Sequence, residues 1–139
     1  MLGRTLYNHL SYGTLIPHKM SVLKQIDTLL ISIDGREHIY NVTRGVGVFP
    51  SLMKSMDLCV SNSIPFNIKM VINRITIKEI DWNISLAHKY GVEIEFVLPY
   101  EVSSDKQPEL HKKLSLSDSE ILNILEEILC DWGRTKATF

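Results

Sequence analysis

The sequence predicts an α+β fold, in which amphipathic helices cover a small antiparallel sheet and a further helix lies near the C-terminus. Two runs, 75–86 and 92–98, carry apolar residues at alternate positions over much of their length, as half-buried strands do. The connection 87–91 has the length of a hairpin loop. Other segments carry apolar residues three or four positions apart, which is the spacing of helices that cover a sheet.

The length of 139 residues predicts a single domain, 1–139, with a core over about 4–100 and a helical extension over about 115–133. The apolar content of 45% is enough for a buried core. The net charge of −1 lacks the basic field that nucleic-acid-binding proteins use. The apolar runs are too short to span a membrane, and the first residues lack a signal-peptide pattern, so we expect a cytoplasmic protein.

Helices are expected first. A short one is predicted over 3–10, and a longer one over 22–33 follows Ser21, a favourable N-cap. An Asp-Gly pair ends the second helix, and a short extended piece is expected at 38–42.

The middle of the chain begins with a glycine turn. Gly45 and Gly47 supply permissive backbone, but no Gly-Lys-Ser/Thr follows, so we expect a tight turn rather than a phosphate-binding loop. Helices are predicted over 51–56 and 65–73. The first strand run then changes phase near Lys78–Glu79, which indicates a β-bulge.

The C-terminal helix has the clearest signals. A polar linker, 103–108, precedes it, and Ser117 and Glu120 form a capping box. The helix is predicted over 118–131, and Gly133 ends it.

Paired carboxylates are one candidate for chemistry. Glu93 and Glu95 project from one face of a strand with side chains starting roughly 7 Å apart, which would suit glycoside hydrolysis. Alternation predicts the same residues on a solvated face, and nothing in the spacing brings Glu79 or Asp81 towards them. We therefore expect a solvated face.

The cysteines and histidines give no metal or redox motif. Cys59 and Cys130 are far apart in sequence and are expected to pack as small hydrophobic residues. No two histidines lie four positions apart, so no helical zinc pair is expected. Cys59 and His38 could pair as nucleophile and base, but nothing in the sequence favours that pairing. We expect no cofactor and no metal.

Arg74 lies among apolar residues, where a helix is expected to give way to a strand. A guanidinium in such a place either extends to solvent or makes bidentate bonds with carboxylates or carbonyls. The sequence leaves both alternatives open.

Three segments form a family pattern: Ser21–Leu30, which reads Ser-Val-x-x-x-Ile-x-x-Leu-Leu, the glycine turn in Arg44–Leu52, and Ile72–Ile75, whose Arg74 lies 29 residues after Gly45. In this order they resemble the phage-baseplate wedge family once labelled lysozyme-like, in particular the TssE baseplate subunits of type VI secretion systems. The Glu-Pro of that family's Glu-Pro-Arg motif and the Pro-Asp of its turn are absent.

The resemblance implies a non-catalytic structural subunit of a contractile injection baseplate, located at the inner face of the cytoplasmic membrane without insertion into it. It implies contacts with the wedge proteins TssF and TssG, strand addition to the first ring of the sheath proteins TssB and TssC, and no nucleic acid partner. The residues that would bind partners are Arg74, Ile75, Gly45, Gly47, Phe49, Val92, Ile94 and Phe96.

Two other functions stay open. One is a small cytosolic adaptor or secretion chaperone that acts through the amphipathic C-terminal helix. The other is a carbohydrate-cleaving enzyme, which would need Glu93 or Glu95 in a cleft.

Overall fold

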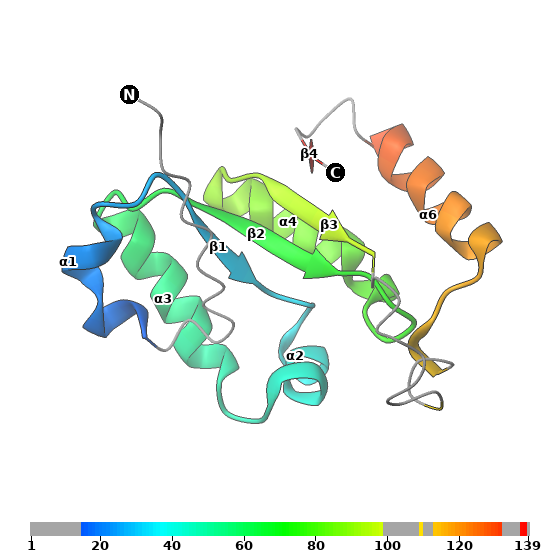
Figure 1. Ribbon diagram of the computed structural model, residues 1–139, viewed down its shortest axis with the longest axis horizontal. Helices are drawn as coiled ribbons and strands as arrows, with labels where there is room; N and C mark the ends of the chain where they lie inside the picture. The colour runs from blue at the N-terminus through cyan, green and yellow to red at the C-terminus, as the bar shows by residue number, and fades with distance from the viewer. Residues whose placement is uncertain (1–14, 99–108, 110–112, 132–136, 139) are drawn as a thin grey trace.

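The computed structural model of the chain describes residues 15–98, 109, 113–131 and 137–138 (Figure 1). Its strands form one sheet in the order β1-β2-β3-β4, and every neighbouring pair is parallel. The elements, in chain order, are η1 (Ile16–His18), α1 (Met20–Leu23), β1 (Leu29–Ser32), α2 (Glu37–Arg44), α3 (Phe49–Ser61), β2 (Phe66–Val71), η2 (Ile77–Glu79), α4 (Ile80–Tyr90), β3 (Ile94–Val97), α6 (Asp118–Asp131) and β4 (Ala137–Thr138).

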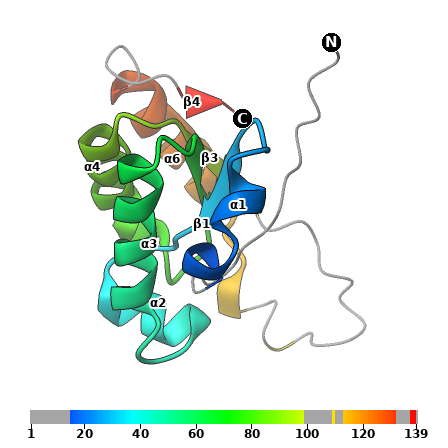
Figure 2. The same cartoon turned by 90° about the vertical axis from the view of Figure 1, so that its left-hand side faces the viewer.

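Parallel pairing requires the chain to cross from the end of one strand to the start of the next, and helices form these crossovers. α2 and α3 lie between β1 and β2, η2 and α4 between β2 and β3, and α6 between β3 and β4. The strand order follows the chain order, as it does for consecutive strands of a βα barrel. Crossovers of one hand therefore bring α3 and α4 to the same face of the sheet (Figure 2).

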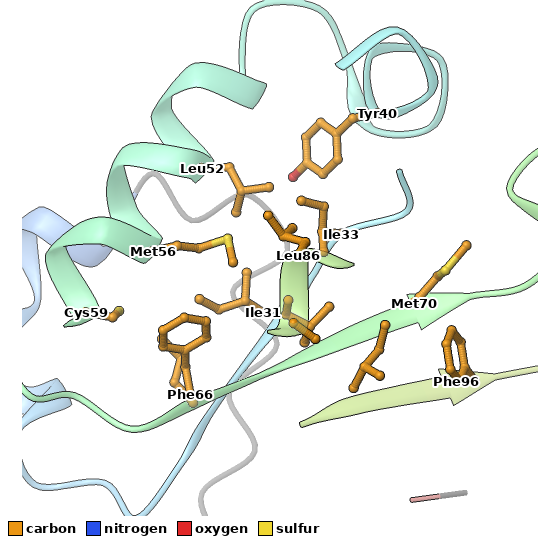
Figure 3. Close-up of a cluster of buried hydrophobic side chains, with 14 of the residues drawn as sticks. Ile31, Ile33, Tyr40, Leu52, Met56, Cys59, Phe66, Met70, Leu86 and Phe96 are labelled. Carbon is orange, nitrogen blue, oxygen red and sulfur yellow. The ribbon is translucent and has the colours of Figure 1, made fainter. Parts of the chain in front are cut away.

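The apolar core lies between this face of the sheet and the helices. Along β2, Phe66, Ile68 and Met70 are buried, and the residues between them are half-buried. Leu52 and Met56 of α3 are fully buried and point towards the sheet (Figure 3). One apolar cluster thus joins the sheet to its helical cover.

The predicted antiparallel sheet is wrong, because the run 75–86 is not a strand. It forms η2 and the first part of α4, and Ile80 and Ile84 lie four positions apart on the helix. The apparent change of phase at Lys78–Glu79 is the junction of η2 with α4. The expected hairpin loop is the end of α4, which Gly91 closes with a left-handed φ of 66°.

Three other elements also differ from expectation. The predicted helix 22–33 is one turn, α1, followed by β1, all of whose residues are buried. A fully buried parallel strand reads as a continuous apolar run, which periodicity cannot distinguish from a buried helix. The expected extended piece at 38–42 belongs to α2, and the expected helix 65–73 contains β2.

The alternation of β3 is confirmed: Ile94 and Phe96 are buried, and Glu95 between them is half-buried. Its predicted role as a sheet edge is wrong, because β3 pairs with β2 on one side and with β4 on the other. The strand is therefore not open to a partner strand along its length.

The C-terminal helix is confirmed, since α6 spans the predicted residues 118–131. The Ser117 backbone N–H donates to Glu120 Oε2 at 2.7 Å, and the Glu120 N–H donates to Ser117 Oγ at 3.3 Å, which is the predicted capping box. In the described part of the chain, no helix combines the length and apolarity needed to cross a membrane. The expected helix 3–10, the linker 103–108 and Gly133 lie outside the described residues.

We predict that Gly35→Ala lowers the free energy of unfolding by about 2–4 kcal/mol. An added Cβ would lie 2.5 Å from Glu79 Cγ and 2.8 Å from Glu79 Cβ, and φ at this position is +149°. Gly91→Ala is the matched control, because φ there is +66° and no atom lies within 4 Å of the added Cβ. Urea unfolding should give a loss of only about 1–2 kcal/mol for the control. Equal losses would show that Gly35 and Glu79 do not pack as described.

Candidate functional site

The loops that follow β1 and β2 lie at the same edge of the sheet, because parallel strands end together. We call this the carboxyl edge. It is formed by residues 33–36 after β1 and residues 72–76 after β2. Ligands of open parallel sheets and of βα barrels bind at this edge, so its polar residues are the first candidates for a site.

Asp34, in the loop just after β1, forms an ion pair with Arg44. Its carboxylate accepts hydrogen bonds from Arg44 Nε at 2.7 Å and Arg44 Nη2 at 3.3 Å, and its side chain is 5% exposed. The Val71 N–H donates to the same carboxylate at 3.4 Å. Asp34 therefore joins β1, the end of α2 and the end of β2.

Glu79 binds the next part of the same loop. Its buried carboxylate accepts the Arg36 backbone N–H at 2.8 Å, Arg36 Nε at 2.9 Å and Arg36 Nη2 at 2.8 Å. Gly35 packs directly on the Glu79 side chain, where a larger residue would collide. The Asn83 amide donates to the Glu79 carbonyl at 3.2 Å, so α4 supports the same junction.

The hydrogen bonds from the Arg36 side chain hold the pKa of the Glu79 carboxyl below its ordinary value, although burial acts in the opposite direction. The same pair raises the pKa of Arg36. Glu79 is thus an anion at neutral pH despite its burial. A buried carboxylate that is fully hydrogen-bonded in this way stabilises one loop geometry rather than serving as a free acid.

The loop after β2 is ordered by a side-chain turn. Asn73 Oδ1 accepts the Ile75 N–H at 2.8 Å and the Thr76 N–H at 3.1 Å. The buried Thr76 hydroxyl donates to the Val71 carbonyl at 2.6 Å. This Asx-type turn orders the backbone on both sides of Arg74.

Arg74 connects this loop to α6. Its guanidinium donates to both carboxylate oxygens of Glu120, at 2.9 and 3.0 Å, and to the Ser115 carbonyl at 2.9 Å. Its backbone N–H donates to the Leu114 carbonyl at 3.1 Å. Of the two alternatives left open by the sequence, the structure shows bidentate bonding to a carboxylate.

A row of polar residues crosses the other face of the sheet. Ser32 is in register with Lys69, and Lys69 with Glu95. Because alternate side chains of a strand point to opposite faces, this row lies opposite the buried Ile68 and Met70. We call Ser32, Lys69 and Glu95 the polar row, and β4 continues its register with Thr138.

The polar row is unusual for this type of sheet. Strands of parallel sheets are normally apolar on both faces, because both faces are covered. Here Ser32 is 5% exposed, and Lys69 and Glu95 are half-buried. Within the described residues, Lys69 and Glu95 have no ion-pair partner within 4.0 Å. The half-buried Lys69 ammonium and Glu95 carboxylate lie side by side and can bind a ligand that carries both charges.

Metal and thiol chemistry find no support among these residues. In residues 15–98, 109, 113–131 and 137–138 there is no group of His, Cys, Asp and Glu that could bind a metal ion. Burial raises the pKa of the Cys59 thiol to about 11, so it is not a thiolate nucleophile at neutral pH. Cys59 packs in the core as expected, whereas the expected packing of Cys130 is wrong, because that residue is exposed on α6.

The residues predicted to bind partners do not form one surface. Arg74 and Ile75 lie at the carboxyl edge, whereas Ile94 and Phe96 are buried beneath the helices. Gly45 and Gly47 lie in the turn between α2 and α3, with φ of 108° and 83°. Phe49 begins α3, and its ring centroid lies 5.7 Å from that of Tyr40. Val92 is half-buried just before β3.

Sequence reasoning missed most residues of the candidate site. Its polar row and carboxyl edge depend on the positions of β1 and β2, both of which the sequence predicted as helix. One signal was present: in Ile31–Gly35, buried apolar residues alternate with polar ones before a glycine, as at the end of a strand. Glu93 is exposed, as expected, whereas Glu95 is half-buried. The pairing of Lys69 with Glu95 depends on the parallel register, which the sequence does not reveal.

No protein-family model and no curated protein matches the sequence. Among solved structures, the chain is similar to a domain of pyruvate-formate lyase-activating enzyme from Bacteroides vulgatus ATCC 8482, with a TM-score of 0.55 and 19% identity. The similarity covers 86% of this chain and 70% of that chain. At this level of identity the match concerns the fold.

This similarity overturns the predicted membership of the TssE baseplate family. The structural role in a baseplate is wrong, and so are the partners TssF, TssG, TssB and TssC. The expected strand addition to TssB and TssC required a free edge strand, whereas β3 is paired on both sides within a parallel sheet. The expectation that the chain is not an enzyme is contradicted as well, because a solved structure with a similar fold is a domain of an enzyme.

We predict that Glu79→Gln lowers the free energy of unfolding at pH 7 by about 1–3 kcal/mol, because it removes charge-assisted bonds to a buried acceptor. The folded-state pKa of Glu79 is lowered, so its contribution is complete above the unfolded value of about 4.3 and is lost as the pH falls through the folded-state pKa. Urea unfolding between pH 7 and pH 3 should therefore show the two proteins converging in acid.

Glu126→Gln, which changes an exposed carboxylate on α6, is the control and should follow the wild type. A constant difference between Glu79→Gln and wild type across this pH range would contradict the role of the Glu79 carboxylate.

Proposed function

We propose that the chain is the ligand-binding sheet domain of an enzyme of the radical SAM family, the family of the solved enzyme with the same fold. The ligand we propose is S-adenosylmethionine, bound on the polar row near the carboxyl edge. The observation that carries the proposal is the polar row itself, which crosses a face that parallel sheets usually make apolar.

The groups of the polar row match the groups of this ligand. S-adenosylmethionine carries a carboxylate, an amino group and ribose hydroxyls in one small molecule. The Lys69 ammonium suits the carboxylate, and the Glu95 carboxylate suits the amino group or the hydroxyls. Rigid strands position both side chains, which favours defined binding geometry over that of a flexible loop.

The carboxyl edge supports the same site from one end. Asp34 and Glu79 each use their carboxylates to bind an arginine, so the loop after β1 has its geometry determined before a ligand arrives. Preorganisation of this kind lowers the entropic cost of binding.

An iron–sulfur cluster, which radical SAM enzymes combine with S-adenosylmethionine, does not fit the residues of this chain. Such clusters are bound by sets of cysteine thiolates. The chain has two cysteines: Cys59 is buried in α3, and Cys130 is exposed on α6. The proposal therefore assigns ligand binding to the chain and no step of cluster chemistry.

Isothermal titration calorimetry with S-adenosylmethionine tests the proposal. We expect the wild type to bind, and Lys69→Ala and Glu95→Gln each to raise Kd about tenfold or more, because loss of a hydrogen bond to a charged group costs about 1.5–3 kcal/mol. Far-UV circular dichroism and thermal unfolding should confirm that both variants are folded.

Lys54→Ala, an exposed lysine on α3 beneath the opposite face, is the matched control and should bind as the wild type does. Binding that is equally strong in all four proteins would move the site away from the polar row. Absence of binding by the wild type at millimolar ligand would refute the proposed ligand.

A further inference from the structure

Among the described residues, α6 is attached to the rest of the molecule at its N-terminal end and along one side. At its N-terminal end, the guanidinium of Arg74 binds Glu120 and the Ser115 carbonyl. Along its length, two side chains, Ile124 and Ile128, are buried in the common apolar cluster. Figure 1 shows the helix at one end of the molecule, near β4.

The contact between α6 and its neighbours is incompletely packed. A pocket of about 350 Å³, partly open to solvent, lies between α6 and the η2–α4 segment. The isoleucines that line it are Ile124 and Ile128 of α6 and Ile77, Ile80 and Ile84 of η2 and α4, and the charged side chains are Lys78, Asp81 and Glu127. Because this pocket opens to solvent and includes charged side chains, apolar atoms of α6 and α4 meet over only part of their facing surfaces. The apolar contact alone therefore stabilises the docked position of α6 weakly.

The N-terminal attachment combines the bonds of the Arg74 guanidinium with one backbone hydrogen bond, from the Arg74 N–H to the Leu114 carbonyl. Arg74 and Glu120 keep 50% and 37% of their side chains exposed, so salt screens their attraction. The Glu120 carboxylate also accepts a hydrogen bond from the backbone N–H of Ser117 at 2.7 Å. The Glu120 carboxylate thus joins the start of α6 to Arg74.

α6 is also linked to the carboxyl edge, through its contact with η2. Ile77 and Lys78 face the pocket beneath α6, while the next residue, Glu79, binds Arg36 in the loop after β1. A displacement of η2 would therefore move Glu79 and, through it, the loop after β1.

We propose that α6 is a detachable strap, closed by a latch of Arg74, Ser115 and Glu120, and that its docking supports the loop after β1 through η2. The latch stands on the contacts of α6 alone. Its consequence for ligand binding rests on the proposed function.

Amide hydrogen exchange on the full chain, measured by mass spectrometry, tests the strap without any ligand. Arg74→Ala and Glu120→Gln are each expected to speed exchange in α6 about threefold to tenfold, because local opening sets this rate. Exchange in residues 36–44 should rise by a smaller factor, and exchange in β1 and β2 should not change. The double variant should exceed neither single variant by much, because both changes open the same latch.

Lys54→Ala is the control and should leave α6 unchanged, since this exposed residue lies on α3. Wild-type exchange in α6 of Arg74→Ala would overturn the latch, and so would an equal rise in the strands, which would indicate global destabilisation. A rise in α6 with unchanged residues 36–44 would overturn the coupling to the loop. These results are independent of the calorimetry, so a failed latch and a failed ligand assignment can be told apart.

Discussion

The constraint on which the structure depends is that a parallel sheet built in chain order receives its helices on one face. α3 and α4 cover that face, and Phe66, Ile68 and Met70 fill the space beneath them. These helices do not cover the opposite face of the sheet. The polar row of Ser32, Lys69 and Glu95 crosses that face, and the proposed ligand-binding function rests on it.

The carboxyl edge shows how ion pairs can determine geometry without contributing much net stability. Arg44, Arg36 and Arg74 each bind one carboxylate, and each pair joins segments that are distant in sequence. The Asp34 and Glu79 carboxylates are buried, so their desolvation offsets much of the attraction to arginine. What these pairs provide is one arrangement of the loops after β1 and β2, with Gly35 permitting the close approach to Glu79.

The sequence was sufficient for elements whose signals are local. The capping box of Ser117 and Glu120 and the alternation of Ile94 and Phe96 identify α6 and β3 correctly. β1 and β2 were predicted wrongly, as helices. Buried parallel strands lack an exposed face, and their apolar runs fit a helical pattern equally well. The candidate site could not be predicted for the same reason, since Lys69 and Glu95 become neighbours only through the parallel register. Glu79 and Arg36 are 43 residues apart, and no local pattern reveals such a pair.

The chemical reactivity of Lys69 tests the central claim most directly. Lysines of the full chain can be methylated reductively with a ¹³C-labelled reagent, with and without saturating S-adenosylmethionine, and quantified residue by residue. The account predicts that the ligand slows modification of Lys69 severalfold and leaves Lys54 unaffected. A bound ligand that leaves the modification rate of Lys69 unchanged would show that the polar row is not the site.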